Sequence, residues 1–303
     1  MPIISVVIPT YNAERTILNT VESVQKQTFS DIEILLINDG STDQTLDLIQ
    51  HISDQRLKIF SYENAGLPVT RNRGVSHAAG EFISFIDADD LWTPDKLELQ
   101  LLALQQHPEA GVAYSWTSYF IDGQETSIFP YDSISLNGNV YSKILVNNFV
   151  ASGSNILVRR KVVESLGGFE PTLRACEDWD FYIRLAAKWD FVVVPKHQIL
   201  YRQSSNAMTS QVDIMEKEAL RVVERAYSAA PPEYHSLKRQ SLAWVYAYCT
   251  QQYLKCTNDM GGVKQAAQKL WQAIQLRPQI LLEDYGQSLT RWLIKRWFLA
   301  LKN

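Results

Sequence analysis

The stretch FISFIDADDLW, residues 82–92, joins an apolar run to three aspartates. The run Phe82–Ile86 consists mainly of aromatic and β-branched residues and predicts a buried strand. Three runs of the same kind precede it, and turn-forming or helix-forming residues follow each one. They are Ile3–Ile8, Ile32–Ile37 and Leu57–Tyr62. This alternation predicts an α/β fold in which helices flank a mostly parallel sheet.

The chain beyond residue 92 predicts a less regular continuation of this domain and then a helical region. Helices are expected over Lys96–Gln106 and Trp179–Lys188, and strands over Val112–Phe120, Ser154–Val158, Phe191–Val194 and Ile199–Tyr201. The polar segments Asp122–Asn139 and Ser204–Gln211 predict loops. From Asp213 onward the pattern is helical, over Ile214–Tyr227, Leu237–Leu254, Val263–Leu276 and Leu281–Leu301. We therefore predict two domains, residues 1–212 and residues 213–303.

Length and composition exclude several classes of protein. A chain of 303 residues that is 46% apolar and 20% charged can bury a core, so disorder is excluded as its main state. Its three cysteines show no CxxC spacing, which argues against a disulfide framework or a structural zinc site and predicts a reducing, cytoplasmic compartment. No apolar run reaches roughly eighteen residues and no basic segment precedes the first run, so neither a spanning helix nor an export signal is expected.

Charge is distributed unevenly along the chain. Residues 1–212 carry a net charge of −9 and residues 213–303 a net charge of +5, which together give −4. A change of sign along a chain suggests two regions with different partners. We expect no nucleic acid among these partners.

Polar residues follow each of the first four predicted strands. Ligands of open α/β sheets bind beyond the carboxyl ends of the strands, so these residues are the first candidates for a site. The four segments are Pro9–Asn12, Asn38–Ser41, Glu63–Gly66 and Asp87–Asp90. We expect them to meet at one edge of the sheet.

The segment Asp87–Asp90 is a candidate metal site. Its three carboxylates repel one another unless a cation lies between them, and Mn²⁺ or Mg²⁺ with a substrate phosphate would supply that charge. The alternative is that these aspartates cap the helix that follows Pro94. Taken alone the segment supports the two interpretations about equally, and the polar ends of the earlier strands favour the metal.

Two further residues have both a structural and a functional interpretation. Asp39 in the turn Asn38–Asp43 can cap a helix, or its carboxylate can accept hydrogen bonds from the base or ribose of a nucleotide. Arg71 lies in a helix expected over Pro68–Ala78, at the same edge of the sheet. It can form a structural ion pair, or it can pair with a diphosphate or with the acidic segment.

The acidic start of the helix near residue 177 offers a candidate general base. Glu177, Asp178 and Asp180 open this helix, and capping with compensation of the helix dipole explains some of them. It does not require all three. A carboxylate held at a helix start can instead accept the proton of a sugar hydroxyl.

Six motifs in this order resemble the family 2 inverting glycosyltransferases of GT-A fold. They are SVVIPTYN at 5–12, NDGSTD at 38–43, ENAGLPVTRNRG at 63–74, FIDADDLW at 85–92, GGFE at 167–170 and EDWDFYIRL at 177–185. The resemblance covers roughly residues 1–205. It implies a GT-A catalytic domain, followed here by a helical C-terminal region.

The resemblance implies a role for each of the candidate residues. Nucleotide binding falls to Pro9, Tyr11, Asp39 and Arg71. Asp87 and Asp89 inherit contacts to the diphosphate and the divalent cation, Mn²⁺ or Mg²⁺, with Asp89 as the direct metal ligand. Asp178 is the implied catalytic base and Glu177 the second candidate for that role.

The implied reaction is a single displacement with inversion of the anomeric configuration. The sugar would move from a nucleoside-diphosphate sugar, a UDP-sugar first on the resemblance, to a hydroxyl of a saccharide or lipid-linked acceptor. The alternative is a nucleotide-sugar binding or scaffold protein without activity, and the presence of Asp89 and Asp178 argues against it. One departure from the family is that Ser204 follows Tyr201-Arg202-Gln203 where relatives often have a histidine. His197 is the suggested substitute, with a packing role as its alternative.

The last helical segment has an unusual composition. Residues 289–302 contain four basic residues and two tryptophans and no acidic residue. Such a helix can lie in an anionic membrane interface, which predicts peripheral contact with the inner face of the cell membrane. The alternative is that its Trp and Leu side chains pack on the catalytic domain.

Overall fold

The structure is a computed structural model that describes residues 1–124, 126–204, 211–257 and 259–301. The chain divides into two compact units. One consists of residues 1–141 and 149–204, and the other of residues 142–148 and 205–303. The loop predicted over Ser204–Gln211 lies almost entirely outside the described residues.

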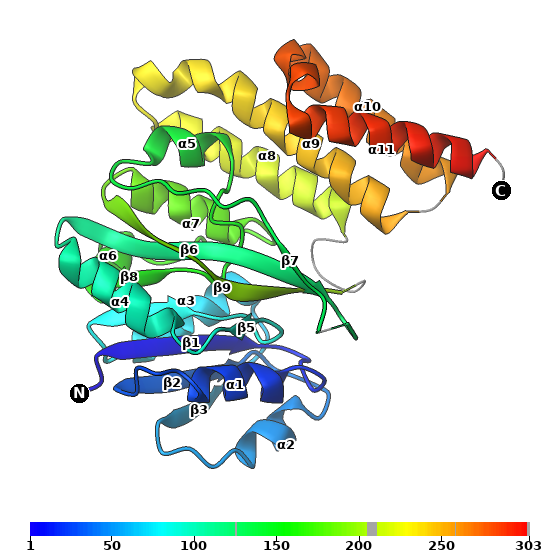
Figure 1. The fold of residues 1–303 in the computed structure, drawn as a ribbon. Helices are drawn as coiled ribbons and strands as arrows, with labels where there is room; N and C mark the ends of the chain where they lie inside the picture. Colours follow the sequence, from blue (N-terminus) through cyan, green and yellow to red (C-terminus); the bar gives the residue numbers. More distant parts are fainter. Residues whose placement is uncertain (125, 205–210, 258, 302–303) are drawn as a thin grey trace. The chain divides into compact units, whose positions relative to one another are not determined.

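The first unit is built on a mixed sheet. Its described strands are β1 (Ile4–Thr10), β2 (Ile32–Asn38), β3 (Leu57–Ser61), β4 (Phe82–Phe85), β5 (Leu91–Trp92), β6 (Ala110–Ile121), β7 (Ile128–Pro130), β8 (Leu157–Arg159) and β9 (Asp190–Gln203). They follow the order β3-β2-β1-β4-β8-β6-β9-β5, with β7 paired to β6 (Figure 1). The four strands from β3 to β4 are parallel, as the sequence predicts, whereas β8 is antiparallel to both β4 and β6.

Helices cover both faces of the parallel strands. The described helices of this unit are α1 (Ile17–Gln25), α2 (Thr45–Gln50), α3 (Leu67–His77), α4 (Lys96–Gln106), α6 (Arg160–Ser165) and α7 (Glu177–Ala186). Helices α1 and α4 share one apolar core with Val6 and Ile8 of β1. The side chain of Val7 points to the opposite face, where α3 packs against β1 and β2. A Cβ at Gly74 would lie 2.2 Å from Cγ1 of Val7, so only glycine lets α3 come this close.

Several elements of this unit, among them the two-residue strand β5, differ from the expectations. Strand β9 is continuous where two strands and a break at Pro195 are expected, because it pairs with β6 along almost its whole length. The register of the β6–β9 pairing shifts near Trp116, so that the two strands stay paired on both sides of Pro195 and Lys196. The segment expected as loop over 122–139 contains the short strand β7, whose residues are all exposed. Helix α6 has no counterpart in the sequence prediction.

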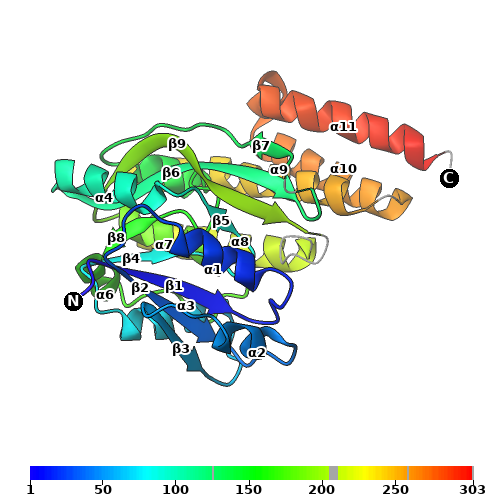
Figure 2. The ribbon, with the colours of Figure 1, turned by 60° about the horizontal axis from the view of Figure 1, so that its bottom comes forward.

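The second unit is helical. It contains most of α5 (Tyr141–Val146), together with α8 (Val212–Ala229), α9 (Lys238–Cys256), α10 (Met260–Leu276) and α11 (Asp284–Ala300), and two 3₁₀ helices (Pro232–Leu237 and Pro278–Leu282). The Ser241 hydroxyl of α9 donates to the carbonyl of Leu145 over 2.8 Å, which ties residues 142–148 to this unit. Figures 1 and 2 show α9, α10 and α11 as neighbours, and Leu270 and Leu289 contribute to their common core. The four predicted C-terminal helices are confirmed.

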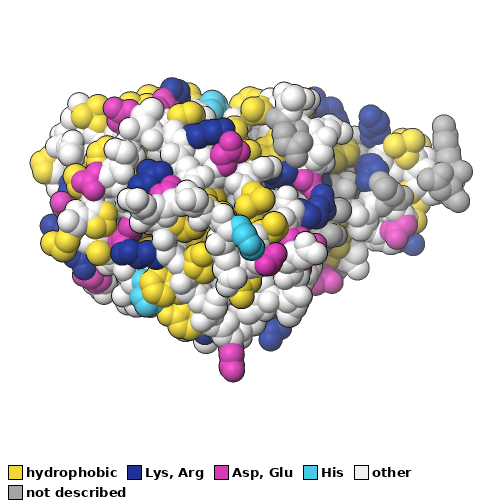
Figure 3. Space-filling model, turned by 90° about the horizontal axis from the view of Figure 1, so that it is seen from below, with side chains coloured by type: hydrophobic (Ala, Val, Ile, Leu, Met, Phe, Trp, Pro, Cys, Tyr) yellow, Lys and Arg dark blue, Asp and Glu magenta, His cyan; other side chains and the backbone are white. Residues whose placement is uncertain are grey.

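The surface carries charges of both signs (Figure 3), and the described helices include none that could cross a membrane. On the face seen in Figure 3, acidic and basic side chains are interspersed, so the acidic surplus of residues 1–212 forms no single patch there. Within the described ranges, no helix combines the length and the apolar character needed to cross a membrane.

Candidate active site

Three strand ends bring the predicted polar segments together. Parallel pairing sets Thr10 of β1 opposite Asn38 of β2, and β4 lies on the other side of β1. The chain therefore leaves β1 at Tyr11, β2 at Asp39 and β4 at Ile86-Asp87 along one edge of the sheet. Helix α3 lies next to this edge because it packs directly on β1 and β2.

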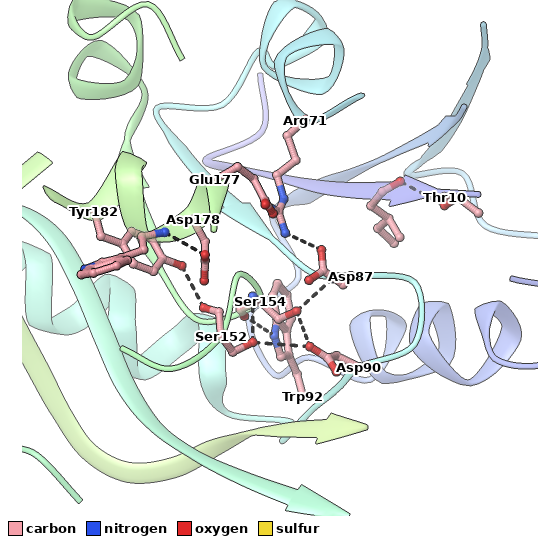
Figure 4. Close-up of polar contacts among 12 residues, drawn as sticks. Thr10, Arg71, Asp87, Asp90, Trp92, Ser152, Ser154, Glu177, Asp178 and Tyr182 are labelled. Atoms are coloured by element: carbon pink, nitrogen blue, oxygen red, sulfur yellow. Dashed lines mark hydrogen bonds and ion pairs between the residues drawn. The ribbon is translucent and has the colours of Figure 1, made fainter. Parts of the chain in front are cut away.

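Arg71 of α3 joins two acidic segments that are far apart in the sequence. Its Nη1 donates to Oε1 of Glu177 over 2.6 Å and its Nη2 donates to Oδ1 of Asp87 over 2.6 Å (Figure 4). The side chain of Arg71 is only 1% exposed. Burial alone would lower the pKa of Arg71, but the charges of Asp87, Glu177 and Asp178 raise it, so the guanidinium stays charged.

A loop glycine makes room for this ion pair. A Cβ at Gly153 would lie 2.4 Å from Nη2 of Arg71 and 3.3 Å from Oδ2 of Asp87. The residue two positions earlier, Ala151, has a φ of 70°, an unusual conformation for a residue with a Cβ. The loop before β8 therefore passes so close to the Arg71–Asp87 pair that residue 153 has no room for a Cβ.

Asp178 has the most perturbed environment at the start of α7. Burial and the neighbouring charge of Glu177 raise the pKa of Asp178 to about 6, although Arg71 opposes this shift. The backbone N–H of Trp179 donates to its Oδ1 over 2.7 Å. Cys176, which precedes the helix, has a φ of 59°, so the chain turns sharply just before the two acidic residues.

The three aspartates after β4 have different surroundings. Asp87 pairs with Arg71. Asp90 is fully buried and accepts hydrogen bonds from the Ser154 hydroxyl at 2.6 Å and the backbone N–H of Arg202 at 3.0 Å. Burial raises the pKa of Asp89 to about 6, with a further contribution from the charge of Asp87. Asp89 is thus destabilised as an anion, and a nearby cation would relieve this.

The carboxylates of Asp87 and Asp89 fit a divalent cation whose other ligands come from the substrate and water. Among the described residues, no group of three or more His, Cys, Asp or Glu side chains is arranged to hold a metal ion. Asp89 and Asp87 offer carboxylate oxygens, which suit Mn²⁺ and Mg²⁺. Such ions commonly take one or two protein carboxylates and complete their coordination with substrate phosphates and water. The residues present match that pattern.

Asp39 lies in a second polar cluster. Its Oδ1 accepts from the backbone N–H of Ala65 at 3.0 Å and from Nη1 of Arg73 at 2.8 Å, and its Oδ2 accepts from the N–H of Gly66 at 2.9 Å. A carboxylate offers about four acceptor positions, so one remains on Oδ2. Arg73 also lies over the ring of Tyr62, 4.5 Å from its centre.

A family comparison agrees with this arrangement. Residues 5–252 match the family described as glycosyltransferase-like family 2. The chain belongs to this family. It is 33% identical over 187 residues to an uncharacterized glycosyltransferase of Rickettsia bellii, which covers 61% of this chain and 26% of that protein. The chain thus spans about a quarter of the length of that relative.

Two other family 2 relatives carry more informative names. The putative teichuronic acid biosynthesis glycosyltransferase TuaG of Bacillus subtilis is 32% identical over 218 residues, which cover 69% of this chain and 82% of TuaG. The Escherichia coli protein WfgD, named as a UDP-Glc:α-D-GlcNAc-diphosphoundecaprenol β-1,3-glucosyltransferase, is 32% identical over 146 residues, or 48% of this chain and 56% of WfgD.

Solved structures show the same fold. Residues 1–349 of S. aureus TarS in complex with UDP-GlcNAc superpose with a TM-score of 0.64 at 21% identity, over 99% of this chain and 91% of that one. The mannosyltransferase PcManGT from Pyrobaculum calidifontis, in complex with GDP-Man and Mn²⁺, also gives 0.64, at 18% identity, over 99% and 87%. At these identities the similarity shows the fold, and the predicted GT-A type is confirmed.

In this family 2 chain, the other two candidate nucleotide-binding residues, Pro9 and Tyr11, also lie at the carboxyl edge of the parallel strands. Pro9 is buried in β1 opposite Ile37, whereas Tyr11 is 52% exposed beyond the strand. Asn12 next to it has a φ of 46°, and its Oδ1 accepts from the backbone N–H of Thr42 at 2.8 Å. This bond links the turn after β1 to the turn after β2. The nucleotide-binding roles of Pro9 and Tyr11 stay predictions.

Sequence reasoning did not single out Arg202 as part of the acidic cluster. Its side chain is buried, its Nε donates to the Asp89 carbonyl at 2.9 Å, and its Nη1 donates to Oδ1 of Asp122 at 2.8 Å. The only signal was an arginine in a strand end, Tyr201-Arg202-Gln203. His197 contacts Ser118 at 3.1 Å and Ser133 at 3.2 Å and also the ring of Trp116, which favours its packing role.

Proposed function

We propose that the protein is an inverting glycosyltransferase that moves a sugar from a UDP-sugar to a hydroxyl of a saccharide or lipid-linked acceptor. The observation that carries this proposal is the environment of Asp178. Its carboxylate has a pKa of about 6 and lies beside the cluster of Glu177, Arg71 and Asp87 at the carboxyl edge of the sheet. A base with this pKa is ionised at neutral pH and still has affinity for a proton.

The transfer step needs one base and one leaving group. The acceptor oxygen forms a bond to the anomeric carbon while the bond from that carbon to the phosphate oxygen breaks, and Asp178 takes the hydroxyl proton. The nucleoside diphosphate leaves with the electron pair, and the configuration inverts. Glu177 is the weaker candidate for the base because its carboxylate is already paired with Arg71 at 2.6 Å.

We assign the metal and diphosphate contacts to Asp89 and Asp87. A divalent cation bound there would neutralise charge that develops on the departing diphosphate. The raised pKa of Asp89 supports this assignment, because burial and the charge of Asp87 disfavour the bare anion. We expect Mn²⁺ or Mg²⁺ in this role.

We place the nucleotide base next to Asp39. The remaining acceptor position on Oδ2 of Asp39 suits an N–H donor, which uracil offers. We assign Pro9 of β1 and Tyr11 just after it to the same nucleotide site, and Arg73 fixes the Asp39 carboxylate through its 2.8 Å hydrogen bond. The solved complexes of TarS with UDP and UDP-GlcNAc support a uridine nucleotide as the first choice.

We further propose an acceptor of the cell-envelope polysaccharides and a cytoplasmic location at the inner face of the membrane. The names of TuaG and WfgD support this acceptor class. The three cysteines, all within the described ranges, form no disulfide, which suits a reducing compartment. In this proposal residues 1–212 carry the chemistry and residues 213–303 form the helical C-terminal region.

A donor screen followed by one variant tests the proposal. We expect one UDP-sugar with Mn²⁺ to raise the melting temperature most, because a bound donor stabilises the folded state by mass action. With that donor, the Asp178→Asn variant should bind UDP as the wild type does and transfer no sugar. NMR of the product should show the anomeric configuration opposite to that of the donor. Retained configuration, or near-normal turnover by the variant, would overturn the mechanism.

A further inference from the structure

Helix α11 is fixed in its rotation by contacts along one side. Leu289 is buried, and Leu293 packs against the core of the helical unit. Nη2 of Arg296 donates to the carbonyls of Leu254 at 2.9 Å and Thr257 at 2.5 Å, where α9 ends. These contacts cap the end of α9 and determine which side of α11 faces its own unit.

The other side of α11 is apolar and exposed. Ile294, Trp297, Phe298 and Leu301 follow the spacing of one helix face, and Phe298 and Leu301 are each 63% exposed. A shallow hollow lined by Leu293, Ile294, Trp297 and Phe298 lies on the helix. Leu293 belongs to both sides, because it also packs against the core, whereas Ile294, Trp297, Phe298 and Leu301 are exposed and do not contribute to that core.

Basic residues adjoin this apolar stripe. Arg291 and Lys295 are both exposed. Arg291 precedes Lys295 by four residues and Lys295 precedes Phe298 by three, so both basic residues lie on the same side of the helix as Phe298. The sequence contains no acidic residue from Tyr285 to Leu301. We use the term outward face of α11 for Arg291, Ile294, Lys295, Trp297, Phe298 and Leu301.

The positive charge of the outward face favours an anionic lipid surface over a second copy of the chain as its partner. A second copy of this chain docked through the same face would bring the basic residues of both copies together without an acidic side chain in this stretch to offset them. An anionic lipid surface complements both features: aromatic and aliphatic side chains enter the boundary between headgroups and acyl chains, and lysine and arginine contact the phosphates.

We propose that the outward face of α11 docks the protein on an anionic lipid surface. Trp297, Phe298, Ile294 and Leu301 supply the apolar contact, and Arg291 and Lys295 supply the electrostatic attraction. The proposal rests on the helical unit alone and stands whether or not the catalytic proposal is correct. If both hold, docking would bring the enzyme to acceptors that are themselves held in a membrane.

Flotation of the full chain with lipid vesicles tests the proposal. We expect binding to phosphatidylcholine vesicles that contain a quarter phosphatidylglycerol, and weaker binding to phosphatidylcholine alone. The double variant Trp297→Ala/Phe298→Ala should weaken binding about tenfold or more. Arg291→Gln/Lys295→Gln should remove most of the preference for anionic vesicles. Trp271→Ala, which removes a tryptophan of α10 that is more exposed than Trp297, is the matched control and should bind as the wild type does.

Circular dichroism and sedimentation accompany each variant. All substituted side chains are exposed, so we expect unchanged helical spectra, and the Trp271 control shows the effect of losing a surface tryptophan in general. No binding of the wild type to anionic vesicles, or equal binding of the Trp297/Phe298 variant, would overturn the proposal. Concentration-dependent dimers that the same variant abolishes, without vesicle binding, would instead assign the face to a second copy of the chain.

Discussion

Replacing the proposed base should make the protein more stable while it removes activity. The fold raises the pKa of Asp178 from 3.8 to about 6, mainly through burial and the charge of Glu177. About two pKa units correspond to at most about 3 kcal/mol of destabilisation at neutral pH. Asp178 is partly exposed, so solvent screening reduces this figure, and we expect Asp178→Asn to gain about 1–2 kcal/mol.

The sign of the effect depends on pH in a defined way. The folded state binds the Asp178 proton more tightly than the unfolded state, so the cost is complete above the folded pKa of about 6 and disappears as pH falls below 3.8. Urea denaturation with EDTA present should therefore show the gain of Asp178→Asn at pH 7.5, and little gain near pH 4. The Asn oxygen can still accept the Trp179 N–H, which keeps the helix start intact.

Asp180 provides the matched control on the same helix. It is buried and pairs with Arg184 at 2.8 Å, so Asp180→Asn should lower the free energy of unfolding by removing the only carboxylate that the structure pairs with Arg184 in the described residues. Opposite signs for the two Asp→Asn changes would separate the electrostatic cost at Asp178 from a general effect of asparagine. A loss of stability in Asp178→Asn at pH 7.5 would refute the reasoning.

The remaining predictions concern activity. In steady-state assays, kcat/KM should fall as pH drops through about 6, because protonated Asp178 cannot accept a proton; a flat profile from pH 5 to 8 would contradict this. Arg71→Lys can pair with only one of Glu177 and Asp87, so kcat should fall about 10–100-fold while the fold survives; unchanged kcat would argue against the bridge. EDTA should abolish transfer and Mn²⁺ restore it, whereas Asp89→Asn should need far more Mn²⁺; full activity in EDTA would exclude the metal.

The parallel half of the sheet could be predicted because its physical signal is local. Strands β1 and β2 are buried along their whole length, which favours largely apolar runs such as Ile3–Ile8 and Ile32–Ile37; the two polar residues in them, Ser5 and Glu33, are hydrogen-bonded to each other. The candidate residues Asp39 and Asp87 stand just after β2 and β4, so their position at one edge of the sheet follows from parallel pairing alone. Strand length in the second half was less predictable, because Pro195 and Lys196 are exposed on β9 and look like a loop in the sequence.

The bridge from Arg71 to Glu177 is the part of the site that the sequence could not predict. These residues lie 106 positions apart, and no periodicity links them. Only the packing of α3 and the placement of α7 bring a guanidinium between two carboxylates. The same is true of Arg202, which contacts Asp89 and Asp122 from the end of β9, a strand that the sequence predicts as two short ones.

This bridge also bears on why the site should need a cation. Arg71 has one positive charge, and it already pairs with Asp87 and Glu177, with Asp178 nearby. The nucleoside diphosphate that we propose as leaving group would add further negative charge next to Asp89, whose pKa is already raised by burial and by the charge of Asp87. Arg71 therefore cannot neutralise the proposed donor as well, and Arg202, which lies beside Asp89, is itself paired with Asp122 at 2.8 Å. In the proposed mechanism a divalent cation held by Asp89 would supply the missing positive charge, and Arg71 would remain free to hold the two acidic segments in place.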